Sequence, residues 1–263
     1  MYIKMKVSDI MTKDVIFVDK DVNLRYVLKL MKKHSITKIP VVEDKKLAGV
    51  ITDNMIAVKL GSIRKKGIPA SKLHASSVTD KVFETVSPDA DVKTILKKVG
   101  EPGPTMLNVV EDKKLVGVVT KADLLPLVNS DKELREIMSK KLITVAPDDR
   151  VIHARRRMID ENIARLPVVN NGTLVGIISD TEIAFALADV KRIFSIGRQK
   201  HRLEELLVGS VMRTPVIWTT PSMTISEGAK IMIKNNIGFL PLIENDSLVG
   251  VVTRTDLLKT IST

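Results

Sequence analysis

The side chains best suited to chemistry in this sequence are a hydroxyl group and a carboxylate spaced three residues apart. The spacing occurs as Thr120 with Asp123, Ser179 with Glu182, and Thr253 with Asp256. At a helix start such a pair forms a capping box, which stabilises the helix by about 0.5–2 kcal/mol. A carboxylate can also accept two hydrogen bonds at once, one on each oxygen. The pattern therefore predicts helix caps whose carboxylates are also able to hold a ligand with two donors.

These polar segments belong to a repeat. A fourth segment, with Thr52 and Met55, has methionine in place of the acid, and each of the four follows a glycine and two branched apolar residues. The glycines are Gly49, Gly117, Gly176 and Gly250. Nine positions before them stand Pro40, Asn108, Pro167 and Pro241, and 38 positions before them stand Met11, Thr79, Met138 and Met212. Four copies in one register indicate one supersecondary unit used four times.

The third copy shows the expected elements of the unit. A β-rich run over 143–145 comes before an amphipathic helix that starts at Val151. Two apolar runs, 166–169 and 174–178, flank an Asn-Gly turn and predict a β-hairpin. A second helix begins near Asp180. The unit is therefore β-α-β-β-α, and the predicted fold class is α+β.

The second copy departs from this pattern. It has Asn108 where the other copies have proline, and it carries Pro102 and Pro104 where its first helix would end. Proline removes a helical hydrogen bond and clashes with the preceding turn. We therefore expect this helix to end early.

One unit alone is too small to be stable. A three-stranded sheet of about fifty residues buries too little apolar surface. We expect the first unit to pair with the second and the third with the fourth, and Ser130 and Glu133 form a capping-box pattern that predicts a helix start at the join. The predicted repeats are 5–60, 73–128, 132–187 and 206–260, and the predicted pairs are 1–128 and 130–263.

Composition limits the function classes. The 263 residues carry a formal net charge of +11, which favours anionic partners such as nucleotides, nucleic acid or an acidic protein. The densest basic clusters, at 64–67 and 191–202, lack the interleaved aromatic side chains that stack on single-stranded nucleic acid. Residues 1–6 lack the apolar core of a signal peptide, and no apolar stretch approaches the ~20 residues that span a bilayer. We expect a cytoplasmic protein that does not enter the membrane.

Catalytic and metal chemistry find little support. There is no cysteine, and the histidines, His34, His74, His153 and His201, lack metal-ligand spacing. Neither a glycine-rich phosphate loop nor a serine nucleophile elbow occurs. The acidic residues form no evident acid–base pair. We expect neither an enzyme nor a metal site, and no cofactor other than a regulatory ligand.

The repeated pattern resembles the CBS domain family, named for cystathionine β-synthase. The resemblance rests on the fourfold β-α-β-β-α order, the Pro-Val/Leu steps that begin at 40, 167 and 241, and the Gly-apolar-apolar-Ser/Thr step. The chain looks like two tandem CBS pairs, or Bateman modules. It is similar in plan to the γ subunit of AMP-activated kinase and to stand-alone archaeal and bacterial four-CBS proteins. The resemblance implies a disc of two modules, with a ligand cleft between the repeats of each.

The resemblance also implies a role for the hydroxyl–acid pairs. In family members that bind adenosine nucleotides, the acid accepts hydrogen bonds from both ribose hydroxyls. The ribose-binding residues implied for this chain are Thr120, Asp123, Thr253 and Asp256. The longer side chain of Glu182 shifts its carboxylate, and Met55 cannot accept such bonds. Whether the clefts of Glu182 and Met55 bind a ligand is left open.

Phosphates require cations, and family members often place one two positions before the proline. The residues directly after the hydroxyl groups offer a second cation to each cleft. The phosphate-binding candidates are therefore Lys38, Lys121, Arg165 and Arg254. Lys38 would join Asp123 in one module, and Arg165 would join Asp256 in the other. The resemblance thus implies two competent clefts.

Adenine requires an apolar slot, which in the family lies around the first strand of the acid-bearing repeat. The candidates are Val82, Phe83, Thr214, Val216 and Ile217. We expect these side chains to serve the hydrophobic core as well.

The leading hypothesis is a non-enzymatic energy sensor that binds AMP, ADP or ATP and is read by an unknown regulated protein. One alternative keeps the fold and changes the ligand to S-adenosylmethionine or methylthioadenosine. The other is a basic scaffold or nucleic-acid-binding protein. Four repeats are sufficient for a monomeric disc, and a homodimer is also compatible with the sequence.

Overall fold

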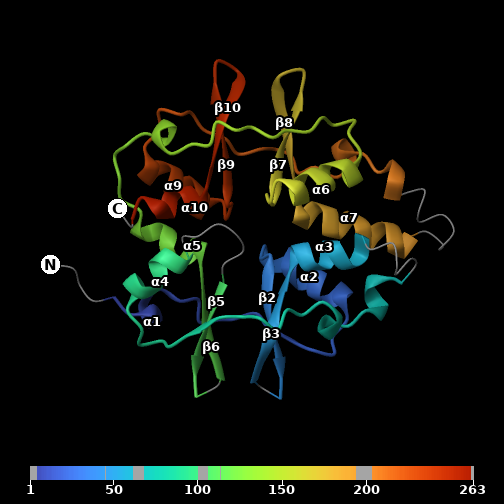
Figure 1. Cartoon of the computed structure of the whole chain (residues 1–263), viewed down its shortest axis with the longest axis vertical. Helices are drawn as coiled ribbons and strands as arrows, with labels where there is room; N and C mark the ends of the chain where they lie inside the picture. Colours follow the sequence, from blue (N-terminus) through green and yellow to red (C-terminus); the bar gives the residue numbers. More distant parts are fainter. Residues whose placement is uncertain are drawn as a thin grey trace.

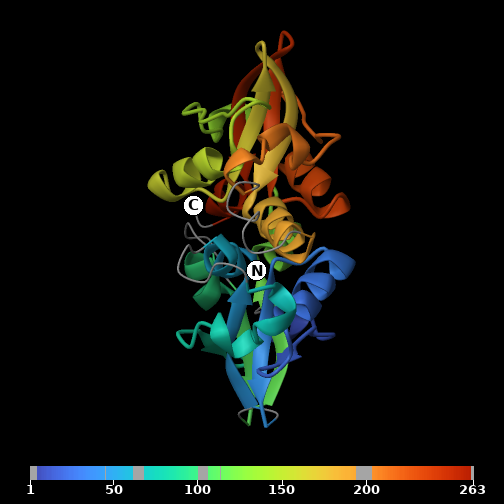
Figure 2. The ribbon, with the colours of Figure 1, turned by 90° about the vertical axis from the view of Figure 1, so that its right-hand side faces the viewer.

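The computed structural model describes residues 5–44, 46–61, 68–99, 106–112, 114–193 and 203–261. Four units of similar build surround the centre of the molecule (Figure 1). The first two, coloured blue to green, form the lower half of this view, and the last two, yellow to red, form the upper half. A quarter turn shows the two halves stacked along the longest axis (Figure 2). The predicted α+β class with four repeats is confirmed.

Each unit contributes a hairpin and the helices that cover it. The first unit contains α1 (Val7–Ile10), β1 (Val18–Asp19), α2 (Leu24–His34), β2 (Lys38–Glu43), β3 (Lys46–Thr52) and α3 (Asp53–Gly61). The second contains β4 (Thr85–Val86), α4 (Val92–Val99), β5 (Met106–Glu111), β6 (Lys114–Thr120) and α5 (Lys121–Leu124). The third contains α6 (Val151–Asp160), β7 (Arg165–Asn170), β8 (Thr173–Ser179) and α7 (Asp180–Ile193). The fourth contains α9 (Ile225–Lys234), β9 (Phe239–Glu244), β10 (Ser247–Thr253) and α10 (Arg254–Lys259). Short 3-10 helices connect them: η2 (Ala70–Lys72), η3 (Ala75–Ser77), η4 (Leu125–Leu127), η5 (Leu134–Glu136) and η6 (Val208–Ser210).

The first strand of each unit is shorter than predicted. In the first two units it consists of β1 and β4, which pair in parallel with β2 and β5. In the last two units it is reduced to single bridges, from Val145 to Val168 and from Thr219 to Leu242. The predicted strand over 143–145 is therefore wrong in length. A proline lies two residues after each bridge, and its missing N–H cannot continue the ladder.

The predicted helix start at Ser130 and Glu133 is also wrong. A single 3-10 turn, η5, forms there, and its capping box joins Glu133 to Glu136, whose Oε1 accepts from the Glu133 N–H at 3.2 Å. Ser130 binds the fourth unit instead, because its N–H donates to Ser226 Oγ at 2.7 Å. Contacts to another unit, rather than a local helix, hold this segment.

Asn108 has a structural reason to replace proline. Its backbone N–H donates to the carbonyl oxygen of Glu84 at 3.1 Å, a ladder bond that proline cannot make. Its side chain donates to the same oxygen at 3.2 Å. The early helix end predicted from Pro102 and Pro104 falls on 100–105, which lie outside the described residues.

The beginning of each unit crosses to the next unit of its pair. Backbone bridges join Thr12 to Val118 and Asp80 to Val50, so the first two units exchange their first segments. The last two units do the same, through bridges from Ser139 to Val251 and from Arg213 to Ile177. The hairpins also meet, since β3 pairs with β6 at Lys46 and Lys114.

This exchange explains the repeated glycines. A Cβ atom at Gly117 would lie 2.5 Å from Sδ of Met11, and one at Gly250 would lie 2.5 Å from Sδ of Met138. The same holds for Gly176 against Met212, and for Gly49 against Thr79 and the Asp80 carbonyl oxygen. The residue 38 positions before one glycine thus packs on the glycine of the other unit in the pair. Only glycine lets the crossing segment approach so closely.

The hydrophobic core connects the two halves, because each core cluster combines one unit of the lower half with one of the upper half. One buried cluster combines the first and third units and includes Leu60 of α3 and Leu187 of α7, which pack together. The other combines the second and fourth units and includes Leu124 of α5 and Leu257 of α10, whose helices also pack together. Sheets and crossing segments therefore join units within a half, and the second helices join the halves (Figure 1).

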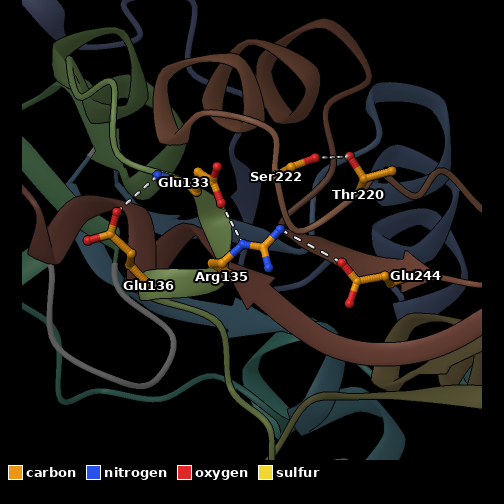
Figure 3. A network of polar contacts seen from close by, with 6 residues as sticks. All are labelled: Glu133, Arg135, Glu136, Thr220, Ser222 and Glu244. Atoms are coloured by element: carbon orange, nitrogen blue, oxygen red, sulfur yellow. Dashed lines mark hydrogen bonds and ion pairs between the residues drawn. The ribbon is translucent and has the colours of Figure 1, made fainter.

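An exposed polar network joins the third and fourth units at the surface. Arg135 of η5 pairs with Glu133 and lies 3.7 Å from Glu244 at the end of β9, while Thr220 and Ser222 bond to each other at 3.1 Å (Figure 3). Both ion pairs are about half exposed. Exposed pairs of this kind contribute about 0–1 kcal/mol. The network is a surface tie between units.

Candidate functional site

The first polar corner forms where β6 meets α5, and we name it the Asp123 corner (Thr12, Thr120 and Asp123). The backbone N–H and the hydroxyl of Thr120 both donate to Asp123 Oδ2, each at 2.7 Å. The hydroxyl of Thr12 donates to the other oxygen, Oδ1, at 2.8 Å. Both carboxylate oxygens are therefore engaged. Sequence reasoning missed Thr12. Its place directly after Met11 is visible in the repeat, but the crossing of its segment to the second unit is not.

The second polar corner forms where β10 meets α10, and we name it the Asp256 corner (Ser139, Thr253 and Asp256). The N–H and hydroxyl of Thr253 donate to Asp256 Oδ2 at 2.8 and 2.7 Å. Ser139 stands at the position of Thr12, but it is exposed and donates no hydrogen bond to Asp256. Within the described part of the chain, Asp256 Oδ1 accepts no hydrogen bond. The two corners thus share their backbone structure but differ in whether a described residue donates to the second carboxylate oxygen.

The other two copies lack this geometry. The hydroxyl of Ser179 donates to Glu182, so the capping pair persists with a longer acid. Thr52 Oγ1 accepts from the Met55 N–H at 3.2 Å, so this cap persists without a carboxylate. A shallow, largely apolar hollow of about 190 Å³ adjoins Met55 and Val58 on α3. Neither copy has an aspartate three residues after its hydroxyl.

The four predicted cations come from four different units and influence one another. Burial, together with the charges of Lys121, Arg165 and Arg254, lowers the pKa of Lys38 to about 8, against the opposing effect of Asp53. Burial and the neighbouring Arg165 lower the pKa of Arg254 to about 10. The helices that begin at Lys121 and Arg254 lie between the two halves (Figure 1). We name these four side chains the central cation group.

The cations approach the carboxylates from the opposite half. Burial lowers the pKa of Lys121 to about 8, and the carboxylate of Asp256 opposes this shift. The ammonium group of Lys121 donates to Thr255 Oγ1 at 2.6 Å. Asp123 in turn opposes the lowered pKa of Arg254. The sequence alone suggested that Lys121 accompanies Asp123 and that Arg254 accompanies Asp256.

Sequence reasoning missed two further acids, the buried Asp180 and the partly buried Asp53. Burial is the main cause that raises the pKa of Asp180 to about 6, and the nearby Asp53 adds to the rise. Burial also raises the pKa of Asp53, whose carboxylate accepts a hydrogen bond from Thr181. The signal was present in the repeat: the residue after the hydroxyl is acidic in the first and third copies and basic in the second and fourth.

Comparison with known proteins places the chain in a family. The model of the CBS domain matches residues 7–61, 75–130, 134–189 and 208–263. The chain belongs to the CBS domain family. The four CBS repeats leave only short linkers between residues 7 and 263.

Two relatives and two solved structures extend the comparison. Over 97% of this chain, protein MJ1404 of Methanocaldococcus jannaschii is 27% identical and MJ1225 of the same organism is 26% identical. The chain spans 62% of the length of MJ1404 and 97% of MJ1225. The crystal structure of MJ1225, described as a proposed archaeal homolog of γ-AMPK, matches with a TM-score of 0.84 and 22% identity, over 97% of this chain and 99% of that one. A conserved protein from Pyrococcus horikoshii matches with a TM-score of 0.60 and 25% identity, over 98% of this chain and all of that one. The four-CBS fold is therefore shared with these structures.

The adenine candidates of the second and fourth CBS repeats are largely at the surface. Val82 is 86% exposed and Ile217 is 37% exposed, and Thr214 is exposed as well. Phe83 and Val216 are partly buried. The expectation that these side chains serve the core is therefore wrong for three of the five. These residues lie between the crossing bridge, at Asp80 or Arg213, and the short first strand or bridge, at Thr85 or Thr219, so they belong to neither pairing.

Few residues of the two basic clusters between CBS repeats are among the described residues. The cluster at 64–67 and the stretch 198–202 lie outside the described residues. Lys191 is only 5% exposed, and Arg192 lies 3.3 Å from Asp189. In the described ranges, no helix is long and apolar enough to span a membrane, and no group of three His, Cys, Asp or Glu side chains is placed to hold a metal.

Proposed function

We propose that this CBS protein is a cytoplasmic regulatory sensor that binds adenine nucleotides at the Asp123 and Asp256 corners. The observation that carries the proposal is the central cation group, to which each of the four repeats contributes one side chain. These side chains are partly buried, and like charges in such surroundings repel one another more strongly than in open water. A phosphate chain supplies the negative charges that offset this repulsion. A ligand with phosphate beside a vicinal diol matches both features of the site.

The carboxylates supply the second part of recognition. Asp256 has one oxygen engaged by Thr253, and within the described chain its other oxygen accepts no hydrogen bond. A carboxylate accepts strong, charge-assisted hydrogen bonds, which suit the two hydroxyl groups of a ribose.

The proposed mechanism is a population shift without chemistry. A nucleotide would contact both repeats of a pair and favour one mutual arrangement, and a partner protein would read that arrangement. The ligand can shift this equilibrium only by its differential affinity for the two arrangements. One chain supplies all four repeats, so a monomer is sufficient for the proposed sites.

A thermal-shift screen tests the ligand class. AMP, ADP and ATP should raise the unfolding midpoint, because a ligand that binds only the folded state stabilises it. Methylthioadenosine and S-adenosylmethionine have the ribose but no phosphate, and they should raise it less. A larger shift with methylthioadenosine than with AMP would favour the alternative ligand. A shift with neither would contradict the proposed sensor.

The difference between the corners predicts the effect of Thr12→Val. The Thr12 hydroxyl occupies the Asp123 oxygen that a ribose would use, and valine removes the donor while keeping the shape. AMP affinity at the Asp123 corner should therefore rise by about three- to tenfold, the worth of one hydrogen bond. Calorimetry on a protein that also carries Asp256→Ala isolates this corner. Ser139→Ala, measured beside Asp123→Ala, is the matched control and should change little. Weaker AMP binding by Thr12→Val would show that Thr12 contacts the ligand instead.

The lowered lysine pKa values predict a pH dependence. Lys38 and Lys121 have pKa values of about 8 in the folded protein and 10.5 as their usual value. The folded protein therefore loses these protons first, so the unliganded protein should become more stable as pH rises from 8 to 10.5. Phosphate binding favours the charged lysines, so AMP affinity should fall over the same rise. Calorimetry between pH 7 and pH 9.5 checks this. Affinity that stays constant would show that neither lysine faces the phosphate.

A further inference from the structure

The contact between α5 and α10 places a lysine of one half beside the acid of the other. The ammonium group of Lys121 lies 2.6 Å from Thr255 Oγ1. Thr255 stands directly before Asp256 and two residues after Thr253. The second-repeat lysine therefore reaches the Asp256 corner of the fourth repeat.

Arg254, the corresponding cation of the fourth repeat, bonds to residues of its own repeat. Arg254 is fixed by two hydrogen bonds, from its Nε to the Ile237 carbonyl oxygen and from its guanidinium to Asn236 Oδ1, both at 3.1 Å. Asn236 itself donates to the carbonyl oxygen of Ser35 at 3.1 Å, which ties this region to the first repeat. The guanidinium is electrostatically coupled to Asp123. Of these two cations, Lys121 has a described hydrogen bond into the other half, to Thr255 beside Asp256.

We propose that the nucleotide site at Asp256 is composite, with Lys121 of the second repeat serving the ligand that Asp256 of the fourth repeat holds. The assignment rests on the proposed function, and it changes which parts of the molecule a ligand would hold together. If a site belonged to one half alone, its ligand would join only the two repeats of that half. In the composite scheme it also joins the halves, because its ribose and its phosphate are held from opposite sides of the α5–α10 contact.

The composite site makes the docking of the halves part of recognition. A nucleotide at Asp256 would stabilise the position of α5, the helix that carries Asp123. A ligand at Asp256 therefore favours one arrangement of the halves. The second ligand would bind to halves that the first has already positioned, so the two sites should bind with positive coupling.

The test isolates each site and removes one cation. In a protein with Asp123→Ala, only the Asp256 site remains, and adding Lys121→Met should weaken AMP binding by about tenfold, because one charge-assisted bond is lost. In a protein with Asp256→Ala, the same lysine change should alter affinity by less than about twofold. Lys29→Met on the exposed face of α2 removes an equal charge and is the control. If Lys121→Met folds poorly, Lys121→Arg is the second variant, and because it keeps the cation it should retain most of the affinity for AMP.

The outcomes separate the assignment from the proposed function. Loss of affinity confined to the Asp256 site supports the composite site. Loss confined to the Asp123 site, or no loss at either, overturns the assignment while leaving nucleotide binding intact. If the wild-type protein binds no AMP, the proposed function itself fails, and the composite site fails with it.

Discussion

Asp256→Ala should weaken AMP binding at its corner by at least about tenfold, because charge-assisted hydrogen bonds of about 1.5–3 kcal/mol each are lost. The corner is built around this carboxylate. Thr253 holds one of its oxygens, and no described residue donates to the other. Calorimetry on a protein that also carries Asp123→Ala reports this site alone.

The same change also removes a helix cap, and that effect requires its own control. Thr224 and Glu227 form a matching capping box at the start of α9, with the Thr224 N–H and hydroxyl donating to one carboxylate oxygen at 3.0 and 2.8 Å. Glu227→Ala therefore removes a cap in the same half without touching the Asp256 corner. It should lower the unfolding midpoint and leave AMP affinity unchanged. Equal affinity losses in the two variants would reduce the role of Asp256 to capping.

Among alanine substitutions of the four repeated glycines, Gly49→Ala should destabilise the protein most. Its Cβ would lie 2.3 Å from the carbonyl oxygen of Asp80 and 2.3 Å from Cγ2 of Thr79. The same carbonyl oxygen accepts from the Val50 N–H at 3.0 Å, so relief of the clash breaks the crossing bridge. Overpacking of a close contact costs about 1–3 kcal/mol, and the involvement of backbone places this change at or above about 3 kcal/mol. Denaturant unfolding measures it.

Gly117→Ala is the informative comparison because its clash has a flexible neighbour. The nearest atom to its Cβ is Sδ of Met11 at 2.5 Å. Shortening that side chain in a Met11→Ala double variant should recover part of the lost stability. Thr79→Ser should recover little in Gly49→Ala, because the Asp80 carbonyl oxygen remains. A loss below about 1 kcal/mol for Gly49→Ala would contradict the close crossing of the segments.

The repeat architecture could be predicted from sequence because each copy has its own local signals. The glycines recur at fixed spacing in all four copies and the hydroxyl–acid pair in three of them, and turns and caps are formed by neighbouring residues. The error at Ser130 shows the limit of local signals. Its pattern fits a helix cap, but Ser226 of another repeat binds it instead.

The spatial partners of the site residues could not be predicted, because spacing along the chain does not show which repeat lies opposite. The constant 38-residue interval was visible, but not that Met11 packs on Gly117 rather than on its own Gly49. For the same reason the approach of Lys121 to Thr255 was missed. The first strands failed differently: they are shorter than predicted, and the exposed residues Val82 and Ile217 come before them.

The central claim is that each chain holds two nucleotide sites, one at Asp123 and one at Asp256. The most direct measurement is the stoichiometry of AMP binding by calorimetry at neutral pH, for the wild type and for the Asp123→Ala Asp256→Ala double variant. We expect two AMP molecules for each wild-type chain and none for the double variant at the same concentrations. Undiminished binding by a folded double variant, or no binding by the wild type, would contradict it.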